Sequence, residues 1–355
     1  MRIAFLHPRL DMSDGTARLV ATVRAALVAG HEVSVVTRKG SHTSSLLGTG
    51  APVFIGELPT QPVLGYFAMR RARRQIAELE PQLLHVTDEA LAPLAVRIAD
   101  ALQRPYVQEV LRPIEARLEF SPQELRAVIL PCESFVERTV NAGQVPRSWL
   151  RVLEHAPNLE RDWLPRQRIE GRRPVVIAIG TLDREHGFDV LVEATRLLVG
   201  AGRRLDVLIL GEGPEEDALR RQVREAQLSD VVSINCATMP NLNVALSQAD
   251  LHVSPTRTGS PGWSAFQALG MGVPSIFTAT SSSFGRVEDK KNGLLIQRND
   301  PMKLSESISM LLENPTSAKQ MGVQARARML ELDGAERYAE DVGRIHSDAL
   351  GLVAT

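Results

Sequence analysis

Short apolar runs alternate with stretches of helical periodicity along this chain, and this alternation limits the fold more than any other sequence feature. Residues 2–6 form an apolar run that we interpret as a buried strand. Apolar residues at helical spacing follow, from Leu19 to Leu27, and Gly30 marks the end of that helix. Residues 31–37 read as the next strand. A strand, a helix and a strand within about forty residues predict a parallel sheet with helices on its faces.

The same pattern continues to the C-terminus. The further predicted strands are residues 83–86, 106–111, 127–130, 174–180, 205–211, 231–234, 251–254 and 273–277. The further predicted helices are residues 70–80, a helix through Leu94 and Ile98, residues 189–198, a helix ending at 227, and two closing helices at 301–312 and 335–352.

One interruption divides this pattern into two halves. Residues 152–172 are rich in Pro, Arg and Glu and have no clear period, so we interpret them as an interdomain linker. We therefore expect a first domain at 1–151, a second at 173–335, and a final helix at 336–355. The predicted fold class is α/β, with two doubly wound, Rossmann-like domains facing a central cleft. Ligands of such sheets bind at the carboxyl ends of the strands.

Composition excludes several classes of protein. The chain has 355 residues, and 44% of them are hydrophobic, which excludes a wholly disordered chain. A net charge of -1 argues against a nucleic-acid partner. Cys132 and Cys236 are too few and too far apart for a disulfide scaffold or a zinc cluster, so we expect no metal. The N-terminal apolar run is too short for a signal peptide, and no run reaches the roughly 18 apolar residues of a spanning helix. We expect a cytoplasmic protein.

A series of motifs, in order along the chain, resembles the family-four glycosyltransferases, which have the two-domain GT-B fold. The motifs are DG at 14–15, GHEV at 30–33, GTLDREHG at 180–187, LVEA at 191–194, LGEGP at 210–214, ADLHVSP at 249–255, ALGMGVP at 268–274, NGLL at 292–295 and DP at 300–301. Each motif is weak alone, and their common order and spacing carry the resemblance, which covers nearly the whole chain. The resemblance also implies that the final helix, 336–355, crosses back to the first domain.

The resemblance implies a retaining, hexosyl-type transferase in surface-polysaccharide or glycolipid assembly. Such enzymes move a sugar from a nucleotide sugar to an acceptor hydroxyl, and we expect no cofactor besides that substrate. Typical members hold the donor's diphosphate with an Arg and a Lys, because negative charge grows on it in the transition state. Two glutamates in an E-x7-E arrangement hold donor hydroxyls, and a histidine of the first domain lies beside the reacting sugar.

This sequence departs from the family at each of those five places. The Arg and Lys positions align with Thr181 and His186, the two glutamates with Gly259 and Gln267, and the histidine with Leu111. Two functions therefore remain open. One is a divergent glycosyltransferase, for which conventional nucleotide-sugar transfer is in question. The other is a catalytically degenerate relative that binds a glycan or is the partner subunit of an active glycosyltransferase.

The candidate site residues follow from these motifs. Those for a donor or another anion are Gly15, Thr181, Arg184, His186, Gly213, Gly259, Ser260 and Gln267. His85 and Asp88 follow a predicted strand and are candidates for acid–base work in the cleft. Each has an ordinary structural alternative. Asp88 could cap a helix, and Gln267 could be a polar residue on a helix face.

A basic cluster in the first half indicates a second kind of partner. Arg70, Arg71, Arg73 and Arg74 lie on a predicted helix, just after an apolar stretch. A basic helix beside exposed apolar residues can bind an anionic membrane at about 1 kcal/mol per charge. We expect this helix to give peripheral membrane contact or, alternatively, to be a solvated surface.

Overall fold

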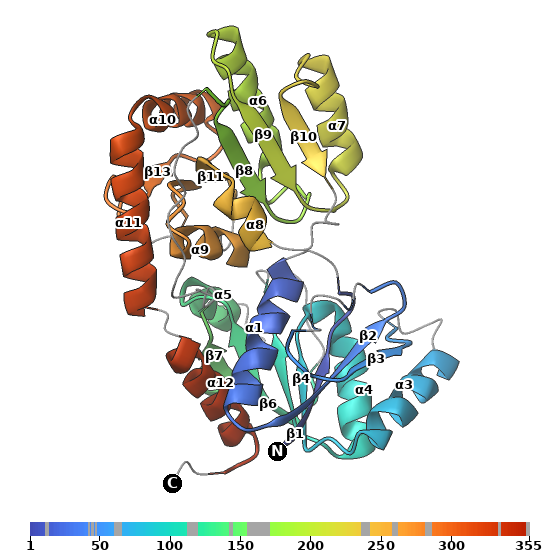
Figure 1. Cartoon of the computed structure of the whole chain (residues 1–355). Coiled ribbons are helices and arrows are strands. Elements are labelled where there is room, and N and C mark those ends of the chain that lie inside the picture. The colour runs from blue at the N-terminus through green and yellow to red at the C-terminus, as the bar shows by residue number, and fades with distance from the viewer. Residues whose placement is uncertain are drawn as a thin grey trace. The chain divides into compact units, whose positions relative to one another are not determined.

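The computed structural model describes residues 1–10, 14–41, 43, 46, 48–59, 66–111, 120–141, 145–154, 171–235, 242–257, 262–280, 286–332 and 335–352. The chain forms two compact units (Figure 1). The first contains Gly15–His155, the opening residues Met1–Asp11 and the C-terminal Ala335–Thr355. The second contains Ala156–Gly334.

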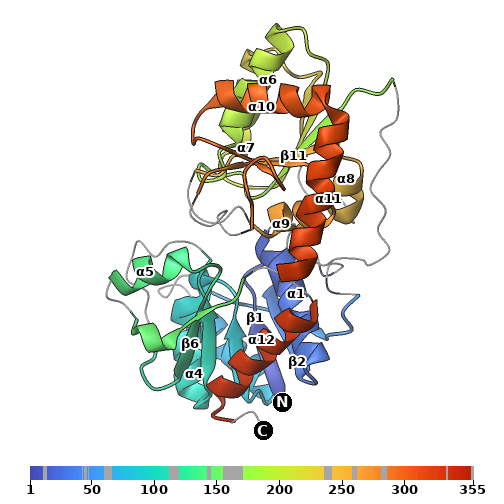
Figure 2. The same ribbon diagram turned by 90° about the vertical axis from the view of Figure 1, so that its left-hand side faces the viewer.

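The first unit is built on a parallel sheet of seven strands in the order β3-β2-β1-β4-β5-β6-β7. The strands are β1 (Arg2–Leu6), β2 (Glu32–Arg38), β3 (Val53–Gly56), β4 (Leu83–Val86), β5 (Tyr106–Glu109), β6 (Leu125–Leu130) and β7 (Leu150–Val152). The helices are α1 (Asp14–Val28), α3 (Tyr66–Glu78), α4 (Ala92–Leu102), α5 (Ser134–Asn141) and α12 (Ala335–Ala349). The last helix, α12, contacts β5 and β6, as Figure 2 shows.

The second unit repeats this plan with six parallel strands in the order β10-β9-β8-β11-β12-β13. The strands are β8 (Val175–Ile179), β9 (Asp206–Leu210), β10 (Val232–Asn235), β11 (Leu251–Ser254), β12 (Ser275–Thr278) and β13 (Leu294–Ile296). The helices are α6 (Phe188–Gly200), α7 (Glu216–Glu225), α8 (Leu242–Ser247), α9 (Trp263–Gly270), α10 (Pro301–Glu313) and α11 (Pro315–Leu332).

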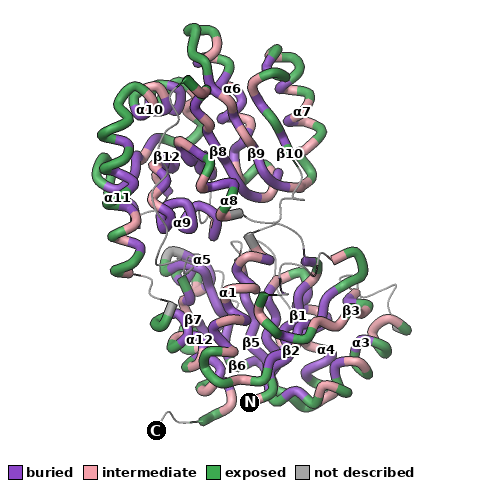
Figure 3. Tube along the Cα trace, in the orientation of Figure 1, coloured by how far each residue is buried: buried purple, intermediate pink, exposed green. Residues whose placement is uncertain are grey.

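The strands form the centre of each core because helices cover both faces of each sheet. In the second unit, Val176, Ile209 and Val253 pack with residues of α6, α7 and α10. The opposite face packs against α8, α9 and α11. Central strands are consequently buried along most of their length (Figure 3). None of the described helices is long and apolar enough to cross a bilayer.

Each sheet has one point at which the strand order reverses, and these points locate the ligand sites of doubly wound folds. In the first unit the reversal lies between β1 and β4, which are paired in parallel. In the second it lies between β8 and β11. A ligand site is therefore expected in the segments that leave the carboxyl ends of these four strands.

The predicted fold class of two doubly wound α/β domains is confirmed, and the differences lie in individual elements. The prediction of two closing helices is wrong, because α11 lies between α10 and α12. The buried residues of α11 include Ala318, Gly322 and Ala325, which are too small to give a strong apolar period. Helix α3 begins four residues earlier than the predicted residue 70, and β5 ends two residues before the predicted 111. Strands β3, β7 and β13 have only three or four residues and were not predicted.

Candidate functional site

In the second unit, the loops that follow β8 and β9 pack closely, with their backbones in contact. A Cβ atom on Gly211 would lie 1.9 Å from the carbonyl oxygen of Gly180, and one on Gly213 would lie 2.4 Å from that of Leu182. Two hydrogen bonds join the loops, from Leu182 N to Glu212 O at 2.9 Å and from Glu215 N to Leu182 O at 2.8 Å. Gly213 is thus required for a close approach of the two loops.

His186 has a defined orientation in the loop after β8. Its Nδ1 lies 2.7 Å from Asp183 Oδ1, which also accepts a 3.0 Å hydrogen bond from His186 N. The imidazole stacks on the Phe188 ring at a centroid distance of 5.8 Å. It also lies against Gly180, where a Cβ would approach His186 Cδ2 to 2.6 Å. Asp183 fixes Nδ1 as the internal contact, and Nε2 has no hydrogen-bond partner among the described residues.

Helix α6 begins directly after this loop. Its N-cap is Gly187, at φ +68°, and no side chain caps the helix. Gly187 is needed for a second reason, because a Cβ there would lie 2.3 Å from Pro255 O. The unbonded N–H groups and the positive end of the helix dipole favour an anion at this terminus. Arg184, three residues before Gly187, is exposed. Thr181 lies in the same loop, and its carbonyl oxygen accepts a hydrogen bond from Asp183 N.

Sequence analysis missed Arg257, which follows β11, one of the two strands at the reversal point of this sheet. Its guanidinium forms a two-pronged pair with Asp189 in the first turn of α6, at 2.8 and 2.6 Å. It also donates to Arg184 O at 2.7 Å and to Asn299 Oδ1 at 2.6 Å. Arg257 N donates to Glu185 O at 2.7 Å. Residues 184, 185 and 189 are therefore all held by one arginine.

The remaining predicted residues of this unit are not brought into that arrangement. Gln267 lies on α9, is fully buried, and donates from Nε2 to Asn243 Oδ1 at 2.8 Å. It is thus part of the packing between α8 and α9. Gly259 and Ser260 lie outside the described residues.

In the first unit, the reversal point joins β1, β4 and the start of α1. His7 follows β1 and is buried, with its Nδ1 at 2.7 Å from Thr87 Oγ1 and its Nε2 at 3.4 Å from Thr16 Oγ1. Thr87 Oγ1 donates to Leu6 O at 3.0 Å. Gly15 is half-buried in the first turn of α1, next to Thr16. His7 is a polar residue at this reversal point that sequence analysis overlooked.

Asp88 has the capping role that was its structural alternative. It is the N-cap of a short 3-10 helix, Glu89–Leu91, and its Oδ1 accepts from Ala90 N at 2.8 Å. Glu89 Oε2 accepts from Leu111 N at 3.2 Å, and Gln108 Nε2 donates to Asp88 O at 3.0 Å. These bonds connect the ends of β4 and β5. The backbone at Leu111, the position aligned with the family histidine, is thus anchored to the β4 loop.

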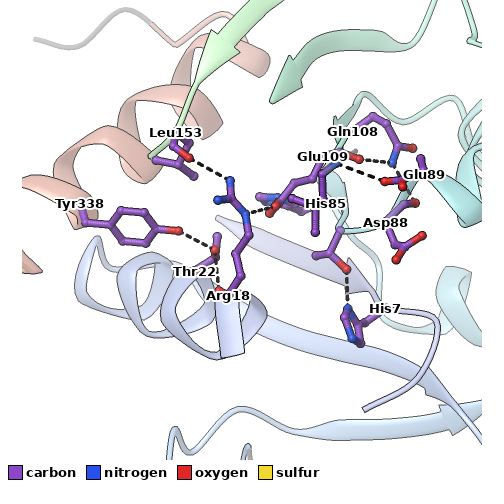
Figure 4. A network of polar contacts seen from close by, with 12 residues as sticks. His7, Arg18, Thr22, His85, Asp88, Glu89, Gln108, Glu109, Leu153 and Tyr338 are labelled. Atoms are coloured by element: carbon purple, nitrogen blue, oxygen red, sulfur yellow. Dashed lines mark hydrogen bonds and ion pairs between the residues drawn. The ribbon is translucent and has the colours of Figure 1, made fainter. Parts of the chain in front are cut away.

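His85 lies within β4, inside the predicted strand 83–86, and not in the segment after it, where its candidate role in the cleft had placed it. Because neighbouring residues of a strand point to opposite faces, His85 faces away from Leu84 and Val86 and meets α12. Its Nδ1 lies 2.8 Å from His346 Nε2, and its Nε2 lies 2.8 Å from Glu109 Oε1. Figure 4 shows His85 and Asp88 separately placed, with His85 directed to Glu109.

Glu109 is the centre of a buried polar network in the first unit (Figure 4). It pairs with Arg18 of α1, and both side chains are only 1% exposed. Burial alone would raise the pKa of Glu109, but Arg18 and His85 outweigh it and lower this pKa to about 2. Arg18 Nη2 also donates to Leu153 O at 3.1 Å. Thr22, on the same helix, bonds the Tyr338 hydroxyl of α12 at 2.9 Å.

A carboxylate in a buried strand was the available signal for Glu109. Its neighbours in β5 are all buried, and buried carboxylates need a partner. The identity of that partner could not be read from the sequence, because Arg18 and Glu109 are 91 residues apart. His346 is 261 residues from His85 and lacked any local signal.

Three comparisons with known proteins agree with this architecture. Residues 160–328 match the family "Glycosyl transferases group 1". The chain is 30% identical to the putative colanic acid biosynthesis glycosyltransferase WcaL of Escherichia coli (strain K12), over 38% of this chain and only 35% of that protein. It is 22% identical to an uncharacterized glycosyltransferase of Haemophilus influenzae, over 96% of this chain and 98% of that protein. The structure of Anabaena Alr3699/HepE in complex with UDP and glucose superposes with a TM-score of 0.79 at 15% identity, over 98% of this chain and 99% of that one.

These matches differ in the part of the chain that they cover. The family match covers the strands and loops of the second unit, including residues 180–187, 211–213 and 257. The likeness to HepE extends over both units and concerns the fold. The second unit thus matches the group 1 glycosyltransferases over residues 160–328, and the two Rossmann-like units together have the GT-B architecture.

Proposed function

We propose that this protein transfers a sugar from a nucleotide sugar to an acceptor in polysaccharide or glycolipid biosynthesis, with retention of configuration. The observation that carries the proposal is the family match over residues 160–328, the segment that builds the reversal point of the second sheet. The names of similar proteins support it, since WcaL is described as a colanic acid biosynthesis glycosyltransferase and HepE is seen with UDP and glucose.

The geometry of the second unit supplies groups that suit a leaving diphosphate. Negative charge develops on the diphosphate as its bond to the anomeric carbon of the donor sugar breaks. Hydrogen-bond donors that are already in position stabilise this charge. The uncapped N-terminus of α6 offers backbone N–H groups. Arg184 offers an exposed guanidinium, and His186 an imidazole that Asp183 holds in place. A helix terminus, an arginine and a histidine would thus do the work that an arginine and a lysine do in typical relatives.

A screen of nucleotides and nucleotide sugars by thermal shift tests this proposal. A ligand at 100 times its dissociation constant adds about 2.7 kcal/mol to the free energy of unfolding. We expect stabilisation by one uridine or guanosine diphosphate sugar and by the matching nucleoside diphosphate. Arg184→Met should weaken that binding at least tenfold, because a charge-assisted hydrogen bond contributes about 1.5–3 kcal/mol. Arg196→Met, on the exposed face of α6, is the matched control and should leave binding unchanged.

A degenerate glycan-binding protein, or a partner subunit of an active transferase, is the competing function. It predicts that no nucleotide stabilises the native protein, while an oligosaccharide or a second transferase does. That result would overturn the proposed transfer activity.

We also propose that α3 contacts an anionic membrane, where a lipid-linked acceptor would be found. Phe67 at the start of α3 is 75% exposed, and Arg70, Arg71, Arg73 and Arg74 are all exposed. Two of these arginines have carboxylate partners, because Arg71 pairs with Glu57 and Arg74 with Glu78, each at 3.1 Å. Arg70 and Arg73 are therefore the charges that would contribute most.

Sedimentation with vesicles tests this contact. The protein should bind vesicles of phosphatidylcholine mixed with phosphatidylserine and not vesicles of phosphatidylcholine alone. Arg70→Glu/Arg73→Glu should abolish binding, whereas Arg221→Glu/Arg224→Glu on α7, an equal change of charge on another exposed helix, should not. An equal loss of vesicle binding in both variants would show that binding depends only on net charge. That result would overturn the assignment of the membrane contact to α3.

A further inference from the structure

Most hydrogen-bond donors of the Arg257 side chain are engaged by the protein itself. Four acceptors surround its side chain: both carboxylate oxygens of Asp189, the carbonyl of Arg184 and the amide oxygen of Asn299. A guanidinium has five N–H donors, and its planar fork matches a carboxylate. With two donors committed to Asp189 and two more to the other acceptors, Arg257 has little capacity left for a ligand.

The position of Asp189 makes this engagement important. Asp189 lies in the first turn of α6, at the terminus where the proposed diphosphate would bind. A carboxylate there favours the helix but competes with a bound anion and repels it. The hydrogen bonds that Arg257 donates to Asp189 have the largest effect in raising the Arg257 pKa, and Glu185 and Glu215 lie close enough to raise it further. Without Arg257, the terminus would therefore be surrounded by carboxylates.

We propose that Arg257 is a positioning residue of the nucleotide site, which neutralises Asp189 and holds the loop 184–187 through the carbonyls of Arg184 and Glu185. This inference rests on the proposed function, because it assigns a role within the same site. Arg257 acts on the diphosphate of a nucleotide ligand only through Asp189 and the loop. It does not touch the ligand.

A mutant cycle measured by calorimetry with UDP, or with GDP if the screen selects it, tests this role. Arg257→Met should weaken binding at least tenfold, because it leaves the Asp189 carboxylate unpaired beside the bound anion. Arg257→Lys should be intermediate, because it keeps the charge and loses the two-pronged geometry. Asp189→Asn alone should leave affinity equal or higher. The double variant Arg257→Met/Asp189→Asn should recover most of the affinity, because the unpaired charge is gone.

This pattern separates an electrostatic positioning role from a merely structural one. If Arg257 only holds the loop together, Asp189→Asn should weaken binding like Arg257→Met, and the double variant should recover nothing. Arg196→Met, which removes an arginine paired with Glu193 from the same helix, is the control and should bind like the native protein. Native-like binding by Arg257→Met overturns the inference alone. Failure of the native protein to bind any nucleoside diphosphate overturns the proposed function and this inference with it.

Discussion

Buried ionisable side chains in this protein are of two kinds, those with a charged partner and those without one. Glu109 has Arg18 and His85 as partners and keeps its charge. His252 of β11 is fully buried beside the Phe277 ring, and neither of its ring nitrogens has a partner among the described residues. Burial lowers the pKa of His252 to about 3, so the imidazole is neutral in the folded protein. The two groups therefore respond differently to substitution and to acid.

Removing the charge of Glu109 should destabilise the first unit strongly. We expect Glu109→Gln to lower its free energy of unfolding at pH 7 by about 3–5 kcal/mol, because the Arg18 guanidinium stays buried without an ionic partner. The pKa of Glu109 is lowered in the folded state, so its contribution is present above pH 4.5 and is lost as the pH falls towards 2. The difference between native and variant should thus shrink at pH 3. Hydrogen exchange of β4 and β5 in urea measures it.

The matched control for this substitution is Glu193→Gln, which removes a carboxylate from an exposed pair with Arg196. Exposed pairs contribute about 0–1 kcal/mol. Equal effects of the two substitutions would show that the Glu109 network does not stabilise the first unit.

His252 should make the second unit sensitive to mild acid. Below pH 6.5 the unfolded chain binds a proton at His252 that the folded protein does not take up until about pH 3. Stability should therefore fall by about 1.4 kcal/mol per pH unit from this group. His252→Phe, measured by urea unfolding between pH 6 and 4.5, should reduce the slope of stability against pH by that amount. An unchanged slope would mean that His252 is not neutral and buried as described.

At the scale of elements, local sequence predicts those features that depend on local patterns. Strands β1, β8 and β9 were found from continuous apolar runs, and the Gly30 stop of α1 has the expected left-handed φ of +79°. Helix α11 was missed because its contact with the turn between α9 and β12 uses small residues: a Cβ on Gly322 would lie 2.0 Å from Gly272 O. That requirement arises from a neighbour 50 positions away and leaves no periodic signal.

The same limit applies to the site. Gly213 and His186 were predicted from the motifs of the loops after β9 and β8, because those loops are short and local. The partners that orient them, and the role of Arg257, depend on β8 and β11 being adjacent in the sheet. Residues 189 and 257 meet only because the strand order reverses there. Spacing along the chain cannot predict such a pair.

Gly213 provides a prediction at this scale. Gly213→Ala would place a methyl group 2.4 Å from Leu182 O, so the loops after β8 and β9 must separate. We expect lower thermal stability and at least tenfold weaker binding of a nucleoside diphosphate by calorimetry. Gly200→Ala is the control, because a Cβ there meets nothing within 4 Å. Native-like binding by Gly213→Ala would show that the close approach of these loops is irrelevant to the site.

At the scale of the whole molecule, the two units follow one plan and differ in what they place at the reversal point. The first unit has buried, mutually bonded groups there, such as His7 with Thr87. Its charged network ties α12, which returns from the end of the chain, to α1, β4 and β5. The second unit has an uncapped helix terminus, a fixed histidine and an exposed arginine. The proposed function therefore places the anionic part of a nucleotide donor at the second unit.

Hydrogen exchange with and without a saturating nucleoside diphosphate tests this assignment most directly. Amides of the first turn of a helix lack internal acceptors and exchange quickly until a ligand binds them. The account predicts that the diphosphate slows exchange at residues 180–189 and 211–216 and leaves β4 and α12 of the first unit unchanged. Binding that slows exchange only in the first unit, or that leaves residues 180–189 unprotected, would contradict it.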